Sequence, residues 1–199
     1  MLLETFVKQH IGEEAPILSK DKDQLYYQEE SIILSKGPIT CDQTGISVLG
    51  EITVEDAAQM YEAGAPGAMV DVEEVLRKNG ILAQEDEINP HIFMKFVTFH
   101  ELGHWNQRNN TSLKNSTLQK TLCNQCNQLW EQIKNKMQAF QRINQFKENN
   151  FVFIQGDRQK KVLEEMKQEI NALLREYSQL YRTIPTEKDA DTYALSRMK

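Results

Sequence analysis

The sequence lacks the long apolar stretch that a membrane-spanning helix needs. None of its 199 residues fall in an uninterrupted apolar run of about 18 or more, and a helix that crosses a bilayer needs about 20. Residues 1–8, MLLETFVK, carry charge too early for a secretory signal. Basic residues are also in the minority, with 23 Lys and Arg against 29 Asp and Glu, a net charge of −6. This balance argues against nucleic acid and anionic membrane surfaces as partners.

Cysteine is scarce as well. The chain contains only Cys41, Cys123 and Cys126, an odd number that suggests a reducing compartment and excludes a disulfide-stapled scaffold. Cys123 and Cys126 are spaced as in redox or structural zinc sites, but a structural zinc would require a second Cys or His pair nearby. Because the pair falls in a long amphipathic segment, we favour its interpretation as small packing residues.

The remaining composition is that of a folded protein, with 40% hydrophobic and 26% charged residues, and predicts a single domain over residues 1–199. Alternating apolar residues predict a short strand within 45–52, and the apolar stretch 24–34 is interpreted as a strand or a short helix. Helices are expected at 53–63, which starts with a sequence close to a capping box, and at about 69–79. The expected fold class is mainly α (α+β), with a small β element upstream.

Histidine is rare, but its distribution is informative. Two of the four histidines lie in residues 100–104, His-Glu-Leu-Gly-His, which match the HExxH signature of zinc hydrolases. On a helix, His100 and His104 project from one face and can occupy two corners of a tetrahedral zinc site. Glu101 lies beside them, where it can take a proton from a water molecule at the metal. The motif therefore predicts Zn²⁺ as cofactor and Glu101 as general base.

The surrounding residues favour a helix. Asn89 can cap its first amides, and Pro90 is tolerated in a first turn. Apolar residues share the face that carries the two histidines, namely Phe93, Phe96 and Val97. Gly103 lowers helix stability by about 1 kcal/mol relative to Ala, which suggests that another backbone approaches closely there. The alternative is an exposed helix that carries His, Glu and His by chance.

A third protein ligand cannot come from the residues directly after the motif. The extended form HExxHxxGxxH would need glycine and histidine where the chain has Gln107 and Asn110, and Trp105 stands where some zinc enzymes have Asp. A distant acidic residue on a second helix is therefore expected. Residues 187–194, Glu-Lys-Asp-Ala-Asp-Thr-Tyr-Ala, provide a candidate.

Together, HELGH and the later E-x-x-A-D-x-x-A resemble the gluzincin zinc metallopeptidases, both the HtpX-like membrane peptidases and the soluble ImmA/IrrE-type peptidases. The resemblance implies that Glu187 is the third zinc ligand and that Asp191 holds a ligand histidine through its outer ring nitrogen. It covers the two motifs only, and the intervening stretch 105–186 is long for the soluble members. The missing apolar run separates the chain from the HtpX-like group.

Helical spacing independently supports these roles for Glu187 and Asp191. Glu187, Ala190, Asp191 and Ala194 lie at i, i+3, i+4 and i+7, so they share one face, and the two alanines permit close packing against the histidine helix. An Asp that accepts the imidazole N–H fixes the tautomer of a ligand histidine. The alternative interpretation is that these charged residues form an ordinary solvent-exposed segment. Other glutamates are rival ligands, although the polar faces of long helices already account for them: Glu131, Glu148, Glu164, Glu165, Glu169 and Glu176.

Residues 112–182 are expected to be mostly helical, because apolar residues recur there at steps of three and four on both sides of Gly156. We predict a long αα-hairpin, inserted between the two metal motifs, whose apolar stripes pack against each other. A second interpretation is that the hairpin binds a partner protein.

These features predict a soluble zinc-dependent endopeptidase that cuts a specific protein substrate. It would be cytoplasmic and cleave a regulator, or be a bacterial effector secreted into a host cytosol. An upstream strand, within 24–34 or 45–52, would bind the extended substrate. His91, Tyr181 and Tyr193 are candidate stabilisers of the oxyanion, although helical spacing points His91 and Tyr193 away from the metal. The alternative function is a non-catalytic binding or regulatory protein with a structural or vestigial zinc site.

Overall fold

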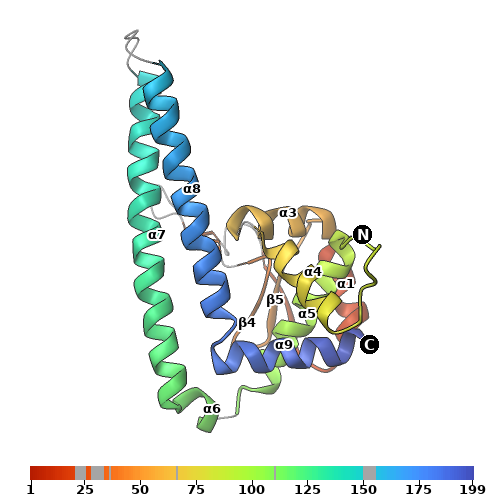
Figure 1. The fold of residues 1–199 in the computed structure, drawn as a ribbon. Helices are drawn as coiled ribbons and strands as arrows, with labels where there is room; N and C mark the ends of the chain where they lie inside the picture. The colour runs from red at the N-terminus through yellow and green to blue at the C-terminus, as the bar shows by residue number, and fades with distance from the viewer. Residues whose placement is uncertain (21–25, 28–33, 36, 66, 110, 150–155) are drawn as a thin grey trace.

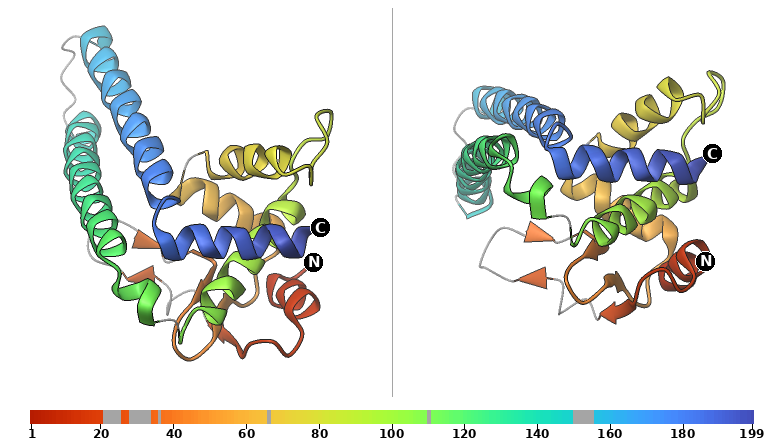
Figure 2. Two further views of the ribbon diagram at one scale, coloured as in Figure 1. Left: turned by 60° about the horizontal axis from the view of Figure 1, so that its bottom comes forward. Right: turned by 90° about the horizontal axis from the view of Figure 1, so that it is seen from below.

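The computed structural model describes residues 1–20, 26–27, 34–35, 37–65, 67–109, 111–149 and 156–199. The chain is mainly helical with a small sheet, as the sequence predicts (Figure 1). A body formed by the N-terminal half and the last helix carries a long helical hairpin on one side, and both termini lie on the other side of the body (Figure 2).

The sheet contains three short strands in the order β1-β5-β4. The central strand β5 (Ile46–Leu49) is fully buried, runs parallel to β1 (Ile17–Lys20) and antiparallel to β4 (Ile39–Cys41). β5 falls inside the predicted strand 45–52. A separate antiparallel pair joins β2 (Tyr26–Tyr27) to β3 (Leu34–Ser35), and most of the predicted stretch 24–34 lies outside the described residues.

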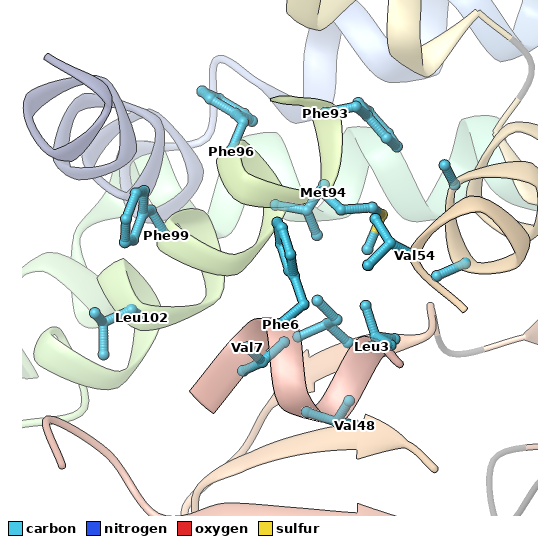
Figure 3. Close-up of a cluster of buried hydrophobic side chains, with 14 of the residues drawn as sticks. Leu3, Phe6, Val7, Val48, Val54, Phe93, Met94, Phe96, Phe99 and Leu102 are labelled. Carbon is cyan, nitrogen blue, oxygen red and sulfur yellow. The ribbon is translucent and has the colours of Figure 1, made fainter. Parts of the chain in front are cut away.

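Helix α5 (Pro90–Asn106) is the centre of the body. Asn89 caps it, with the Asn89 side chain accepting the Ile92 N–H at 2.9 Å, and Pro90 occupies the first turn. Its apolar side chains pack on α1 (Leu3–Ile11) and on β5, as Figure 3 shows for Phe6, Met94 and Val48. Each large apolar side chain buried in this core contributes about 1.5–3 kcal/mol to folding, so the position of α5 is firmly set.

Two further helices pack beside α5. They are α3 (Val54–Gly64) and α4 (Ala68–Lys78), each within one residue of its predicted bounds. The predicted capping box of α3 is present, because the Thr53 side chain accepts the Asp56 N–H while Asp56 accepts the Thr53 N–H. These helices complete the wall of the body that faces the hairpin.

The predicted hairpin is formed by α7 (Thr117–Asn149) and α8 (Gly156–Tyr181), which lie side by side and extend beyond the body (Figure 1). It begins later than the predicted residue 112, since residues 111–115 form the separate short helix α6 (Thr111–Asn115). The apolar stripes face each other, and their most buried members are Cys126, Leu129, Ile133, Leu163 and Ile170. The last helix, α9 (Pro185–Met198), turns back across the body and packs on α5.

Among the helices that the structure describes, none combines the length and apolar character needed to cross a membrane.

Candidate metal centre

The two sequence motifs meet where α9 crosses α5. A β-carbon placed on Gly103 would lie 2.9 Å from the Ala190 Cα and 3.2 Å from the Ala190 Cβ. Ala190 is fully buried in this contact. The close backbone approach that Gly103 predicts is therefore present, and glycine and alanine allow the motif-bearing faces of the two helices to touch.

This contact brings three ligand atoms together. His104 Nε2 lies 3.1 Å from His100 Nε2 and 3.1 Å from Glu187 Oε2, and His100 Nε2 lies 3.3 Å from the same carboxylate oxygen. Within the described part of the chain, these residues form the one group of three or more potential metal ligands.

The cluster fits a zinc ion. Bonds of about 2.0–2.1 Å in a tetrahedral site would place neighbouring ligand atoms about 3.3–3.4 Å apart, close to the distances found here. Two imidazole nitrogens and one carboxylate oxygen are also a donor set that zinc accepts, and three protein ligands leave a corner for water or substrate. The distances and the donor chemistry therefore both suit the metal that the motif predicts.

Asp191 holds His100 from the side opposite the cluster. Asp191 Oδ1 lies 2.8 Å from His100 Nδ1, and Asp191 Oδ2 accepts a hydrogen bond from Arg182 Nη1 at 3.0 Å. A carboxylate on Nδ1 directs the Nε2 lone pair of His100 toward Glu187 and His104. Arg182 lies just after α8, outside both motifs, and sequence analysis did not identify it.

The charges around the cluster favour a cation. Burial lowers the pKa of His100, but hydrogen bonds with Asp191 and Glu187 outweigh it and raise that pKa to about 10. Burial raises the pKa of Glu187, but hydrogen bonds from His100 and His104 outweigh it and lower the pKa to about 2. The carboxylates of Glu187 and Asp191 therefore stabilise a positive charge on or between the two imidazoles. Either a proton or a metal ion can supply that charge.

Glu101 lies beside the cluster, in an environment that stabilises a negative charge less than the environment of Glu187 does. Burial raises the pKa of the Glu101 carboxyl, the Glu187 carboxylate raises it too, and the two histidines act in the opposite direction. The nearby backbone of Cys41, in β4, also acts to lower the pKa of Glu101. A carboxylate with a raised pKa is a better proton acceptor near neutral pH.

Two cavities meet at these residues. A polar cavity of about 810 Å³ is bordered by β4 and the end of α5, and an apolar cavity of about 480 Å³ lies between α5 and the hairpin. Glu101, Tyr181 and Glu187 line both cavities. The candidate site is therefore open on two chemically different sides.

The strand that borders the polar cavity is β4, and the sequence analysis missed it. The predicted strand within 45–52 cannot offer an edge to a substrate, because β5 is hydrogen-bonded to β1 on one side and to β4 on the other. Thr40 and Cys41 of β4 line the cavity instead. The strand has only three residues, too few to produce a detectable alternation in the sequence.

Of the three proposed oxyanion stabilisers, only Tyr181 lies at the cluster. It lines both cavities with Glu187, and burial together with the Glu187 charge raises its pKa, so it stays a protonated donor. His91 lies 3.6 Å from Glu55, and the Tyr193 hydroxyl lies 3.4 Å from Glu14. Both point away from the site, as helical spacing predicts.

The first turn of α9 is held by two glutamines that sequence analysis did not identify as functional. Gln107 Nε2 donates to the Thr186 carbonyl and to Asp189, both at 2.9 Å. Gln119 accepts the Thr186 N–H at 3.1 Å and donates to the Thr186 hydroxyl at 2.9 Å. Thr186 precedes Glu187, so these bonds fix the position of the carboxylate.

The other candidates lie elsewhere. Among the rival glutamates, Glu131, Glu165 and Glu169 pair with lysines on the hairpin. Cys126 is buried in the hairpin, and Gln119 lies 3.5 Å from the Cys123 sulfur. Cys41, Cys123 and Cys126 are all free thiols.

Comparison with known proteins adds no family. No protein-family model, curated protein or solved structure matches the chain. A functional interpretation must therefore come from the motifs and from the geometry described above.

Proposed function

We propose that the protein is a zinc-dependent endopeptidase that hydrolyses peptide bonds of a specific protein substrate. The observation that carries the proposal is the convergence of His100, His104 and Glu187, from motifs far apart in the sequence, at ligand distances beside the Glu101 carboxylate. The resemblance of both motifs to those of gluzincins supports the same assignment. The substrate is a regulator in the same cell or, if the chain is a secreted effector, a host protein.

Glu101, Asp191 and Tyr181 have different roles in the proposed hydrolysis. When bound, a zinc ion polarises the scissile carbonyl and makes a water molecule more acidic. Glu101 takes the proton from the attacking water and passes it to the leaving amine as the C–N bond breaks. Asp191 keeps His100 in the orientation in which Nε2 is a ligand. Tyr181, a neutral hydroxyl at the junction of the two cavities, donates a hydrogen bond to the oxygen of the reacting carbonyl.

The free edge of β4 supports a binding mode for the substrate. Among the strands that the structure describes, β4 pairs with β5 alone, so an extended peptide can add to its other edge through main-chain hydrogen bonds. Cys41 of β4 and Glu101 line the same polar cavity, which brings this edge next to the general base. A bound peptide would therefore run past Glu101.

Replacing Glu101 with Gln tests the proposal. Glu101→Gln preserves the shape but not the base, so we expect one zinc per chain and a loss of activity of about 10²–10⁴-fold. Zinc is measured by mass spectrometry of the metal, and activity by mass spectrometry of cleaved casein and a peptide library. Glu74→Gln, on the exposed face of α4, is the matched control. A Glu101→Gln protein that cuts as fast as the parent would refute the general-base role.

A second function is favoured by the shape of the hairpin. It extends beyond the body (Figure 1). A long pair of helices that extends away from a body offers helix faces on which another protein can pack. In that case the protein would be a binding or regulatory protein with a structural zinc. Full zinc occupancy without cleavage of any tested substrate would favour it.

A further inference from the structure

The apolar cavity beside the candidate centre has a composition of its own. It lies between α3, α4 and α5 on one side and the hairpin on the other, and its volume of about 480 Å³ is typical of ligand pockets. Six aromatic rings line it, namely Tyr61, Phe93, Phe96, Trp130, Tyr177 and Tyr181. The residues that it shares with the polar cavity bordered by β4 are Glu101, Tyr181 and Glu187.

Charged groups occur at one end of the apolar cavity only. They are the residues of the candidate centre, together with Arg182, whose guanidinium is paired with Asp191 at 3.0 Å. At the α4 side, the Ser178 hydroxyl is used in a 2.7 Å bond to Asp71. Among the described residues that line the cavity, no charged side chain lies away from the centre. A charged ligand group placed there would lose its hydration without gaining an ion pair.

Three of the six aromatic rings in this lining belong to the hairpin, namely Trp130, Tyr177 and Tyr181. Trp130 of α7 packs on Tyr177 of α8 with ring centroids 5.4 Å apart, and both rings face α5 across the cavity. On the opposite wall, Tyr61 and Phe93 meet edge to face at 5.7 Å. The hairpin therefore closes a pocket that the body alone would leave as an open face.

We propose that this pocket receives a large apolar side chain, aromatic or aliphatic, of the substrate residue next to the cleaved bond. The proposal depends on the proposed function and specifies its substrate class. A peptide whose reacting carbonyl lies between Glu101 and Glu187 has a neighbouring side chain within reach of this pocket, which opens on both carboxylates. Burying such a side chain strengthens binding by about 10- to 100-fold. The inserted hairpin thereby determines specificity.

The test uses small hydroxamates as probes, since a hydroxamate binds a metal centre and its substituent reports on the adjoining pocket. Zinc-loaded full-length protein is titrated calorimetrically with acetohydroxamate, 3-phenylpropanohydroxamate and succinate monohydroxamate. The last two share one linker and differ in a phenyl or a carboxylate end. We expect the phenyl compound to bind about 10- to 100-fold more tightly than acetohydroxamate, and the carboxylate compound to show no gain.

Two variants connect the gain to the pocket. Ala65 lines the pocket from its exposed rim, so Ala65→Trp should fill it and abolish the phenyl gain without disturbing the core. Ala63→Trp, on an exposed residue outside the lining, should keep the gain. Trp130→Ala removes a ring that the hairpin contributes to the pocket, so it should reduce the gain in affinity of the phenyl compound. Zinc content and circular dichroism verify that each variant is folded.

The outcomes separate the two proposals. If acetohydroxamate does not bind the zinc-treated wild-type protein, the metal centre is wrong and both proposals are overturned. If acetohydroxamate binds but the phenyl compound gains nothing, the pocket assignment alone is overturned. It is also overturned if Ala65→Trp and Ala63→Trp bind the phenyl compound equally well. A phenyl gain that only Ala65→Trp and Trp130→Ala diminish supports the proposal.

Discussion

The contact at Gly103 shows how a single residue sets the distance between the two ligand helices. A methyl group there would lie 2.9 Å from a backbone atom of Ala190, and backbone on the packed face of a helix cannot move aside cheaply. The glycine therefore weakens α5 locally but allows His100 and His104 to reach Glu187. The requirement for close approach outweighs the helix propensity.

Gly103→Ala should for that reason destabilise the protein, although alanine is the better helix former. The gain of about 1 kcal/mol in propensity is offset by overpacking, which typically costs about 1–3 kcal/mol, and α9 must shift with Glu187. We expect a lower urea midpoint and weaker zinc binding by competition with a chelator. Asn106→Ala, on the exposed end of the same helix, should change stability by less than about 0.5 kcal/mol. Equal effects of the two variants would contradict this account.

Asp191 contacts the candidate metal centre through His100. Its carboxylate accepts from Nδ1 at 2.8 Å and is itself held by Arg182, so its charge makes Nε2 a stronger ligand. Asp191→Asn preserves the shape and removes the charge. We expect zinc affinity to fall about 10- to 100-fold, measured with a fluorescent zinc indicator. Asp189→Asn, two residues away, retains an acceptor for Gln107 and should bind zinc as the wild type does; if it loses as much affinity, Asp191 has no special role.

At the level of elements, the start of α9 depends on one residue that precedes the inserted hairpin and one that belongs to it. Gln107 follows the histidine helix and Gln119 lies in the first turn of α7, and both bind Thr186. Thr186 and Glu187 are buried. The hairpin is therefore attached at its base to the candidate metal centre, and the position of Glu187 depends on how α7 docks.

Gln119→Ala should reveal this attachment. The variant leaves the buried Thr186 N–H without its acceptor, which costs about 1–3 kcal/mol, and it frees the first turn of α9. We expect a lower free energy of unfolding and faster amide exchange in residues 186–190. Gln125→Ala, an exposed position on the same helix, is the control and should change neither. Unchanged exchange in Gln119→Ala would show that α9 is positioned by its contact with α5 alone.

The elements also show what the sequence could and could not predict. Periodicity in steps of three and four predicted α5, the hairpin and the shared face of Glu187 and Asp191, because helical geometry is local. Strand β4 was missed, since three residues acquire strand character only by pairing with β5. Arg182, Gln107 and Gln119 were missed because their partners lie in other helices. Long-range packing determines those contacts, and no local pattern encodes them.

At the level of the whole molecule, the candidate centre joins parts of the chain that would otherwise be far apart. Residues 105–186 separate His104 from Glu187, and the ligand atoms come within reach of one another only when α9 has packed on α5. A metal ion that holds all three ligands therefore binds the folded state and has little affinity for the unfolded chain. Such a ligand stabilises the fold by mass action.

Zinc should accordingly raise the melting temperature of the protein. At a free concentration about 100 times the dissociation constant, the expected stabilisation is about 2.7 kcal/mol, and a chelator should reverse it. Differential scanning calorimetry with and without zinc measures the change. His104→Ala should abolish the shift because it removes a ligand from the cluster, whereas His91→Ala, whose ring faces Glu55, should preserve it. If zinc left the melting temperature unchanged, or if His91→Ala lost the shift as His104→Ala does, the three residues would not form a metal centre.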